Sequence, residues 1–462
     1  MTTAPRTFSH HLRATIRLAL PLAGSQLAHF AMHVTDTVML GWYGVGALAA
    51  GVLGASSYFI LFILGSGFAS AAMGMVASAM ARDDETQVRR DVRMAIWLSL
   101  IYACAVYPVF YFSGSILKLF GQDPGLAAGA QDYLRIIGLG LIPSLVVMVL
   151  RSFAAALERV SIVLMSTVAA ALMNGVLNWM LIFGNWGAPE LGLKGAAFAT
   201  LGSQVMALSV VAACAFWHPA MRRFHLFRRL WRPDWPVFFH LARRGLPVGL
   251  TQVAEGSLFN AAALMMGWIG MVQLAAHGIA LEAAALTFMI HIGIGNAATV
   301  RVGRFHGLGQ AVEMRRAALA AVAVSMAVAS VVIVVFLSAP GQIVGLFVED
   351  HDPAAAEILA FGTTLLAVAA VFQLFDALQA LALALLRGVQ DTAAPMWIAS
   401  FSYWIVGIPV SYLLAFPMGM GGVGLWFGLV SGLACAAILL MLRFWSGYLR
   451  PETLPDALAA RG

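Results

Sequence analysis

The sequence contains few charged residues and almost no lysine. Charged residues make up 10% of the 462 residues, whereas soluble globular domains carry roughly 25%. This deficit excludes an ordinary soluble enzyme of this length. Lys118 and Lys194 are the only lysines, and each follows a leucine, which excludes a phosphate-binding loop of the G-x-x-x-x-G-K type. Because the chain lacks this nucleotide-binding loop, any energy-requiring process that it carries out must draw on an ion gradient or on a partner subunit.

Cysteine is also scarce. Cys104, Cys214 and Cys435 each lie inside an apolar run, far from one another in the sequence. They form neither a metal-binding spacing nor a disulfide framework. We interpret them as small core residues, and we expect no cofactor and no metal beyond a bound coupling ion.

Apolar runs are abundant instead. Hydrophobic residues make up 61% of the chain, and runs of about 20 residues, enough to cross a bilayer, recur throughout it. The first run follows three arginines without a convincing cleavage site, which favours a retained span over a signal peptide. We predict an all-α integral membrane protein with twelve transmembrane helices, near residues 14–38, 47–80, 92–115, 131–157, 160–183, 193–217, 240–264, 272–300, 315–339, 356–386, 394–416 and 422–446.

The basic residues predict the orientation of these spans. With the N-terminus inside, 24 of the 27 lysines and arginines fall on inner segments, as the positive-inside rule requires. We therefore expect a multi-pass protein of the bacterial inner membrane with both termini in the cytoplasm. The net charge of +6 reflects this topology and gives no reason to propose nucleic-acid binding. The inner loop around residues 218–239 is rich in arginine, which favours contact with anionic membrane lipids.

The chain contains an internal repeat. A shift of 226 residues aligns Pro21 with Pro247, the segment M-L-G-W-Y-G at 39–44 with M-M-G-W-I-G at 265–270, and Arg89-Arg90 with Arg315-Arg316. Six spans per half make the repeat parallel, with a pseudo-twofold axis along the membrane normal. Such paired bundles are typical of transporters. We predict an N-lobe at 1–221, a basic linker at 222–239 and a C-lobe at 240–462.

Three acidic residues lie inside predicted spans. Asp36 lies toward the outer end of span 1, Glu255 in the middle of span 7 and Asp376 well inside span 10. A charge at mid-membrane costs roughly 2.5–3.5 kcal/mol on insertion scales. Each acid is therefore either a protonated structural group held by hydrogen bonds or a cation or proton site.

Other polar residues are candidates for the same chemistry. Asn174 and Asn178 lie four residues apart in span 5, which places both amides on one helix face. They can bind Na⁺ or a carboxylate, or they can form hydrogen bonds between helices. Glu282 in span 8 and Asp352 in the outer loop before span 10 are candidates for contact with the substrate.

The sequence resembles the multidrug and toxic compound extrusion (MATE) transporters, in their NorM-like bacterial branch. The resemblance lies in P-L-A-x12-D-T-V-M-L-G at 21–41, the Asn174 and Asn178 pair, G-A-A-F-A-T at 195–200, Glu255 and the run from Phe375 to Met396. It covers nearly the whole chain and agrees with the repeat.

The resemblance implies two six-helix lobes around a V-shaped cavity. It implies that Asp36 is the N-lobe acid whose protonation or cation binding is linked to bending of span 1 at Pro21. Asn174, Asn178 and Thr200 match the polar neighbours of that acid. Glu255 and Asp376 match C-lobe acids that bind the coupling cation. The aromatic residues beside Asp376 in the sequence are Phe372 and Phe375.

These observations together predict a transporter, not an enzyme. It would export cationic or amphipathic small molecules by antiport with Na⁺ or H⁺, as a monomer surrounded by lipid. A lipid-linked precursor flippase of the same superfamily is the first alternative, but it should favour a cationic cavity. An integral-membrane enzyme is the second, but the sequence shows no cluster of catalytic residues at one membrane face.

Overall fold

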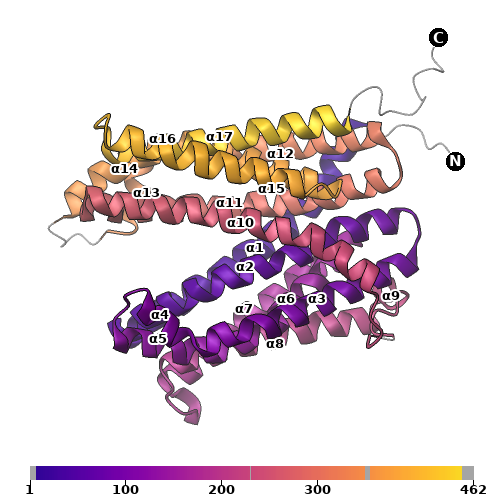
Figure 1. Cartoon of the computed structure of the whole chain (residues 1–462), viewed down its shortest axis with the longest axis horizontal. Helices are drawn as coiled ribbons and strands as arrows, with labels where there is room; N and C mark the ends of the chain where they lie inside the picture. Colours follow the sequence, from indigo (N-terminus) through magenta and orange to yellow (C-terminus); the bar gives the residue numbers. More distant parts are fainter. Residues whose placement is uncertain (1–6, 229, 349–353, 450–462) are drawn as a thin grey trace. The chain divides into compact units, whose positions relative to one another are not determined.

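A computed structural model describes residues 7–228, 230–348 and 354–449, and within these ranges it contains helices and no strand (Figure 1). The α-helices are α1 (Phe8–Tyr43), α2 (Val45–Ala81), α3 (Glu85–Tyr111), α4 (Ser113–Leu119), α5 (Pro124–Ile137), α6 (Leu141–Ala156), α7 (Val160–Phe183), α8 (Leu193–Trp217), α9 (Pro219–Arg222), α10 (Trp235–Ile269), α11 (Met271–Gly307), α12 (Ala311–Ser338), α13 (Pro340–Gly345), α14 (Ala355–Gly388), α15 (Ala393–Ser400), α16 (Ile408–Ala415) and α17 (Gly421–Tyr448). Two 3-10 turns, η1 (Gly138–Gly140) and η2 (Asn185–Gly187), and one π-helical segment, η3 (Phe401–Gly407), complete the helical structure of these ranges.

The predicted twelve-helix architecture is confirmed. Ten helical stretches of the described residues are long and apolar enough to cross a membrane. One joins α5 to α6 and another joins α15 to α16. The long helices α1 and α10, of 36 and 35 residues, lie at the positions of the other two predicted spans. The bounds of α7 and α8 coincide with the predicted spans 160–183 and 193–217.

Local sequence signals explain where several helices begin and end. Before α5, the Asp123 side chain accepts hydrogen bonds from the amides of Gly125 and Leu126, and Pro124 occupies the first helical position, where no amide donor is needed. Helix α7 ends at Gly184, whose φ of 72° lies in the left-handed region that glycine adopts without strain.

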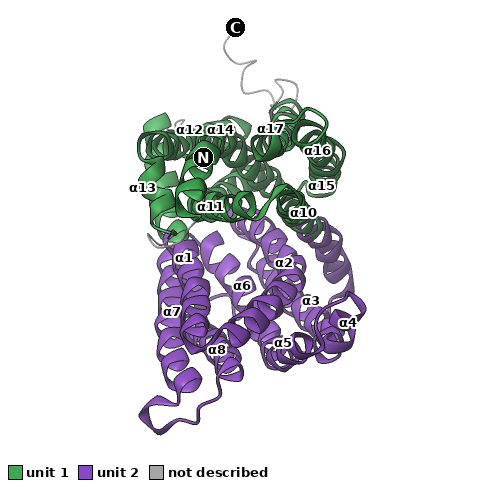
Figure 2. Ribbon diagram, turned by 90° about the vertical axis from the view of Figure 1, so that its left-hand side faces the viewer, with its two compact units in different colours: residues 1–23, 250–462 green, residues 24–249 purple. Residues whose placement is uncertain are grey.

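The chain divides into two compact units (Figure 2). One contains residues 1–23 and 250–462, and the other contains residues 24–249. The sequence analysis had placed residues 1–23 in the N-lobe and residues 240–249 in the C-lobe. The first part of α1 instead groups with the second half of the chain, and the first part of α10 groups with the first half. Pro21 and Pro247 each lie two residues before the point at which the helix passes from one unit to the other.

Close helix crossings hold both of these helix beginnings in place. In the unit of residues 24–249, a Cβ atom on Gly67 of α2 would collide with the backbone of Gly245 and Gly249 on α10, with the Gly249 Cα at 2.8 Å. In the other unit, a Cβ atom on Gly293 of α11 would collide with the backbone of Ala23 and lie 2.8 Å from its Cβ. Gly67 and Gly293 are equivalent in the repeat, so both units use the same crossing.

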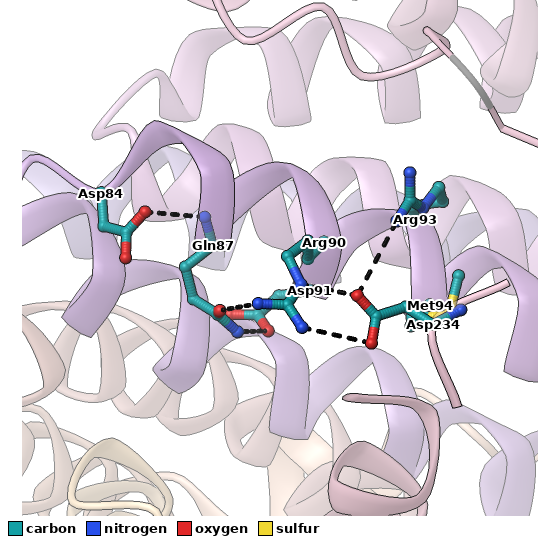
Figure 3. A network of polar contacts seen from close by, with 7 residues as sticks. All are labelled: Asp84, Gln87, Arg90, Asp91, Arg93, Met94 and Asp234. Carbon is teal, nitrogen blue, oxygen red and sulfur yellow. Dashed lines mark hydrogen bonds and ion pairs between the residues drawn. The ribbon is translucent and has the colours of Figure 1, made fainter. Parts of the chain in front are cut away.

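A polar network also fixes the beginning of α10 (Figure 3). The Arg90 guanidinium donates two hydrogen bonds to Asp234, from Nε at 2.6 Å and from Nη2 at 3.2 Å. Arg93 lies 3.9 Å from the same carboxylate. Gln87 donates to Asp91 and accepts from Arg90, which orients the guanidinium.

Polar contacts from α11 and α12 hold the beginning of α1. The buried His11 lies 2.9 Å from Glu313 through Nε2 and 2.7 Å from Arg301 through Nδ1. Since Arg301 can only donate, Nδ1 accepts, and Nε2 carries the proton that is shared with Glu313. Glu313 and Arg316 are the counterparts of Gln87 and Arg90. The two helix beginnings therefore dock at equivalent places with different polar partners.

We expect Asp234→Asn to lower the free energy of unfolding at pH 7 by at most about 1 kcal/mol, because Arg90 is 40% exposed and solvent screens the pair. The hydrogen bonds from Arg90 hold the pKa of Asp234 below its usual range. The pair therefore stabilises the fold above the unfolded pKa, about 3.9, and this stabilisation is lost as the pH falls through the lower folded value. Thermal unfolding of the two proteins in detergent should differ at pH 7 and converge at acid pH.

Glu85→Gln is the matched control for this prediction. It breaks an ion pair with Arg223 at 3.7 Å in which both side chains are about half exposed. We expect no measurable change in melting temperature. If Asp234→Asn behaved like this control at pH 7, the Arg90 pair would not contribute to stability.

Candidate functional site

Asp36 is the centre of a hydrogen-bonded cluster in the unit of residues 24–249. Its Oδ1 atom accepts from the Nδ2 of Asn174 at 3.0 Å and from the Nδ2 of Asn178 at 2.6 Å. Its Oδ2 atom accepts from the hydroxyl of Thr200 at 3.1 Å. Helices α1, α7 and α8 thus bring together the four residues that the sequence had selected for this site.

The positions of the two asparagines follow from helix geometry. A separation of four residues on α7 aligns their side chains, and both are fully buried. The Nδ2 of Asn178 also donates to the Oδ1 of Asn174 at 3.3 Å. The Oδ1 of Asn178 has no hydrogen-bond partner among the described residues.

This arrangement gives the cluster two chemical states. Three donors directed at one carboxylate stabilise its ionised form. A protonated Asp36 would need an acceptor, and a half-turn of the Asn178 amide would present its unpaired oxygen in place of the nitrogen. The cluster can therefore respond to a proton or a cation by rearranging one amide. Tyr133 of α5, which the sequence analysis did not single out, lies close enough to Asp36 to interact with it electrostatically.

A second acidic cluster lies in the other unit, on α10 and α14. Asp376 is 3% exposed, and it lies close enough to Glu255 for the two charges to interact. Gln379, one helical turn after Asp376, donates to the Oε1 of Glu255 at 3.4 Å. It also donates to the hydroxyl of Tyr403. Arg387, at the end of α14, interacts electrostatically with Glu255.

Sequence reasoning missed Gln379 and Tyr403. The spacing of three between Asp376 and Gln379 was a usable signal, because such residues share a helix face. For Tyr403, the signal was a phenol inside an apolar span, which needs a hydrogen-bond partner when it is buried. Phe372, one helical turn before Asp376, packs edge to face with Phe259 and Trp426.

The remaining candidates lie apart from these clusters or beyond the described residues. Glu282 is exposed on α11 and forms no part of either cluster. Asp352 lies outside the described residues, so its contact with the substrate stays a prediction. Pro21 lies inside the continuous helix α1, where it removes a backbone donor. Its role as a bend also stays a prediction.

Comparisons with known proteins agree with this architecture. The sequence profile of the MatE family matches residues 21–180 and 247–413. The chain is 44% identical to the "Probable multidrug resistance protein NorM" of Rhizobium meliloti (strain 1021), over 97% of this chain and 96% of that protein. It is 41% identical to the protein of the same name in Agrobacterium fabrum (strain C58 / ATCC 33970), over 94% of this chain and 93% of that protein.

A solved structure supports the same fold. The crystal structure of a eukaryotic MATE transporter superposes with a TM-score of 0.86 at 21% identity, over 96% of this chain and 98% of that one. The two stretches matched by the family profile begin at the repeat-equivalent residues Pro21 and Pro247. The profile match spans both halves of the repeat, and curated relatives align over nearly the full chain, so the protein belongs to the MatE family.

Proposed function

We propose that the chain exports cationic or amphipathic small molecules across the bacterial inner membrane, in exchange for Na⁺ or H⁺. The observation that carries this proposal is the Asp36 cluster, in which one intramembrane carboxylate accepts three hydrogen bonds. Its relatives are named as multidrug resistance proteins. The positive-inside pattern supports cytoplasmic termini, and we propose that the protein works as a monomer surrounded by lipid.

The proposed cycle uses competition for the acids. When the carboxylates of Asp36, Glu255 and Asp376 are ionised and free, they attract an organic cation. When Na⁺ or H⁺ occupies them from outside, that attraction is lost and the organic cation leaves. A ligand can shift a conformational equilibrium only by its differential affinity for the two states. The rearrangement of the Asn178 amide offers one local source of such a difference.

Purified protein in proteoliposomes tests this proposal directly. We expect efflux of ethidium when an inward Na⁺ gradient or an inward pH gradient is imposed separately, and no efflux without either. The gradient that drives efflux identifies the coupling ion. Efflux under neither gradient from correctly folded protein would contradict the proposal, and binding of a lipid-linked precursor by that same protein would then favour a flippase.

A further inference from the structure

His11 is a buried base at the beginning of α1, and it lies between two side chains of opposite charge. Its Nε2 atom donates to Glu313 of α12 at 2.9 Å, and its Nδ1 atom accepts from Arg301 of α11 at 2.7 Å. The ring is fully buried and packs against Phe305, with 5.6 Å between the ring centroids. Thr15, one turn further along α1, is also buried, but its hydroxyl has no hydrogen-bond partner among the described residues. Of these two polar residues, His11 therefore supplies the bonds to α11 and α12.

This arrangement requires a neutral imidazole. A neutral ring has one donor and one acceptor, as the two bonds need, whereas a protonated ring donates from both nitrogens. Protonation of His11 would direct the Nδ1 proton at the guanidinium of Arg301, which has no acceptor. The bond would be lost, and two positive charges would face each other in a buried place. Turning the ring over would not help, because both nitrogens of the protonated ring donate.

Glu313 compensates only part of this charge. Its carboxylate also accepts from Arg316 at 3.2 Å, so it is shared between two bases. The charged groups that act on His11 are Arg301 of α11, Glu313 of α12 and the neighbouring His10. Burial, together with the charge of Arg301, holds the pKa of His11 below the ordinary histidine value of about 6.5, against the opposing effect of the hydrogen bond to Glu313.

The beginning of α10, in the other unit, has an anchor of a different kind. There Asp234 accepts two hydrogen bonds from Arg90, and an arginine stays protonated throughout the neutral range. The carboxylate stays ionised well below neutral pH, because its ordinary pKa is about 3.9. Mild acidification therefore acts on the anchor of α1 and leaves the anchor of α10 in place.

We propose that His11 is a proton sensor that releases the beginning of α1 from α11 and α12 when the cytoplasm becomes acidic. His11 precedes the first predicted span, near 14–38, so in the proposed orientation it meets protons from the cytoplasm. Helix α1 continues from Phe8 to Tyr43 and carries Asp36. The consequence for export rests on the proposed function, since protons that enter in exchange would loosen this helix and slow further export.

Hydrogen exchange of the purified full-length chain tests the sensor without transport. Because the docked state has the lower pKa, docking is complete above about pH 6.5 and weakens as the pH falls toward the docked value. We expect the protection factors of the amides of residues 12–19, which correct for the pH dependence of exchange itself, to fall on the order of 10-fold between about pH 8 and about pH 5.5. The amides of residues 236–246, at the beginning of α10, should keep their protection over the same range.

Three variants separate the titration of His11 from general damage. His11→Gln cannot be protonated, and its amide offers one donor and one acceptor, so protection should not depend on pH. Glu313→Gln keeps an acceptor for Nε2 but removes the negative charge that favours the imidazolium, so the loss of protection should move to lower pH. His10→Gln changes the exposed neighbour on the same turn and is the matched control. It should keep the parental pH dependence.

Two results would overturn the sensor. One is a parental loss of protection on acidification in His11→Gln, and the other is constant protection in the parent protein down to about pH 5.5. If His11→Gln is unprotected at every pH because α1 no longer docks, Glu313→Gln decides the question. An unchanged midpoint in that variant would show that a group other than His11 titrates.

Efflux measurements keep the sensor and the export function apart. At a fixed pH difference across the membrane, lowering the pH on the cytoplasmic face should slow ethidium export by the parent protein more than export by His11→Gln. Equal slowing of both proteins would contradict the effect on export. If docking depends on pH but neither gradient drives efflux, the sensor stands and the export function is wrong. If efflux occurs while docking does not depend on pH, the export function stands and the sensor is wrong.

Discussion

Gly67→Val should abolish or severely reduce the yield of folded protein. The new Cβ atom would overlap the backbone of α10 at Gly245 and Gly249, and backbone atoms cannot move away as a flexible side chain can. Overpacking typically costs 1–3 kcal/mol, and we expect about 3 kcal/mol here because the obstruction is rigid on both sides. Size-exclusion profiles and thermal unfolding in detergent measure the effect. Gly293→Val should behave in the same way at the equivalent crossing with Ala23.

Two other glycines provide the control for this prediction. A Cβ atom on Gly256 of α10 or on Gly278 of α11 would meet nothing within 4 Å. Gly256→Ala and Gly278→Ala should therefore retain the parental yield and melting temperature, or gain slightly from the higher helix propensity of alanine. If Gly67→Val were as stable as these variants, the backbone crossing would not be required for folding.

Asp36→Asn should reduce gradient-driven efflux on the order of 100-fold while the protein remains folded. The substitution preserves the volume and most of the hydrogen-bonding capacity of the side chain. It removes the negative charge of the carboxylate, whose oxygens accept three hydrogen bonds and would hold the coupling ion. Losing one charge-assisted interaction of about 3 kcal/mol corresponds to this factor. Initial rates of ethidium efflux from proteoliposomes measure it.

Asp132→Asn is the control for this variant. Asp132 is an acid on α5 that forms an exposed ion pair with Lys194 at 3.1 Å. Its loss should leave efflux unchanged, because exposed pairs contribute little and the residue lies outside both clusters. Parental efflux in folded Asp36→Asn protein would show that this carboxylate does not couple ion movement to export.

The sequence predicted the helices well because length and hydropathy suffice to define a span. The bounds of α7 and α8 were reproduced to the residue, since polar or glycine-rich turns interrupt the apolar runs on both sides. Less regular features left no such signal. Neither the 3-10 turn Gly138–Gly140 nor the π segment Phe401–Gly407 changes the mean hydropathy of its span.

The candidate sites were predictable where one helix supplied the pattern. The Asn174 and Asn178 pair could be recognised by its spacing, and Asp36 by its charge inside a span. Tyr403 could not be placed in the same way, because its contact with Gln379 joins residues 24 positions apart and depends on the register of a π turn. The grouping of residues 1–23 with the second half was equally invisible, because hydropathy does not report which helices pack together.

This exchange of helix beginnings bears on how such a chain could arise by duplication. Each compact unit includes a helix beginning from the other half of the sequence, which we call its arm: the part of α1 up to residue 23 in one unit and the part of α10 up to residue 249 in the other. A half-length ancestor of about 230 residues, folded as one unit is here, would have lacked its own arm and gained it from a second copy, as in a domain-swapped dimer. Fusion of two copies would then have turned an exchange between molecules into one within a single chain. The repeat-equivalent crossings at Gly67 and Gly293 show that the two units receive these helix beginnings in the same way.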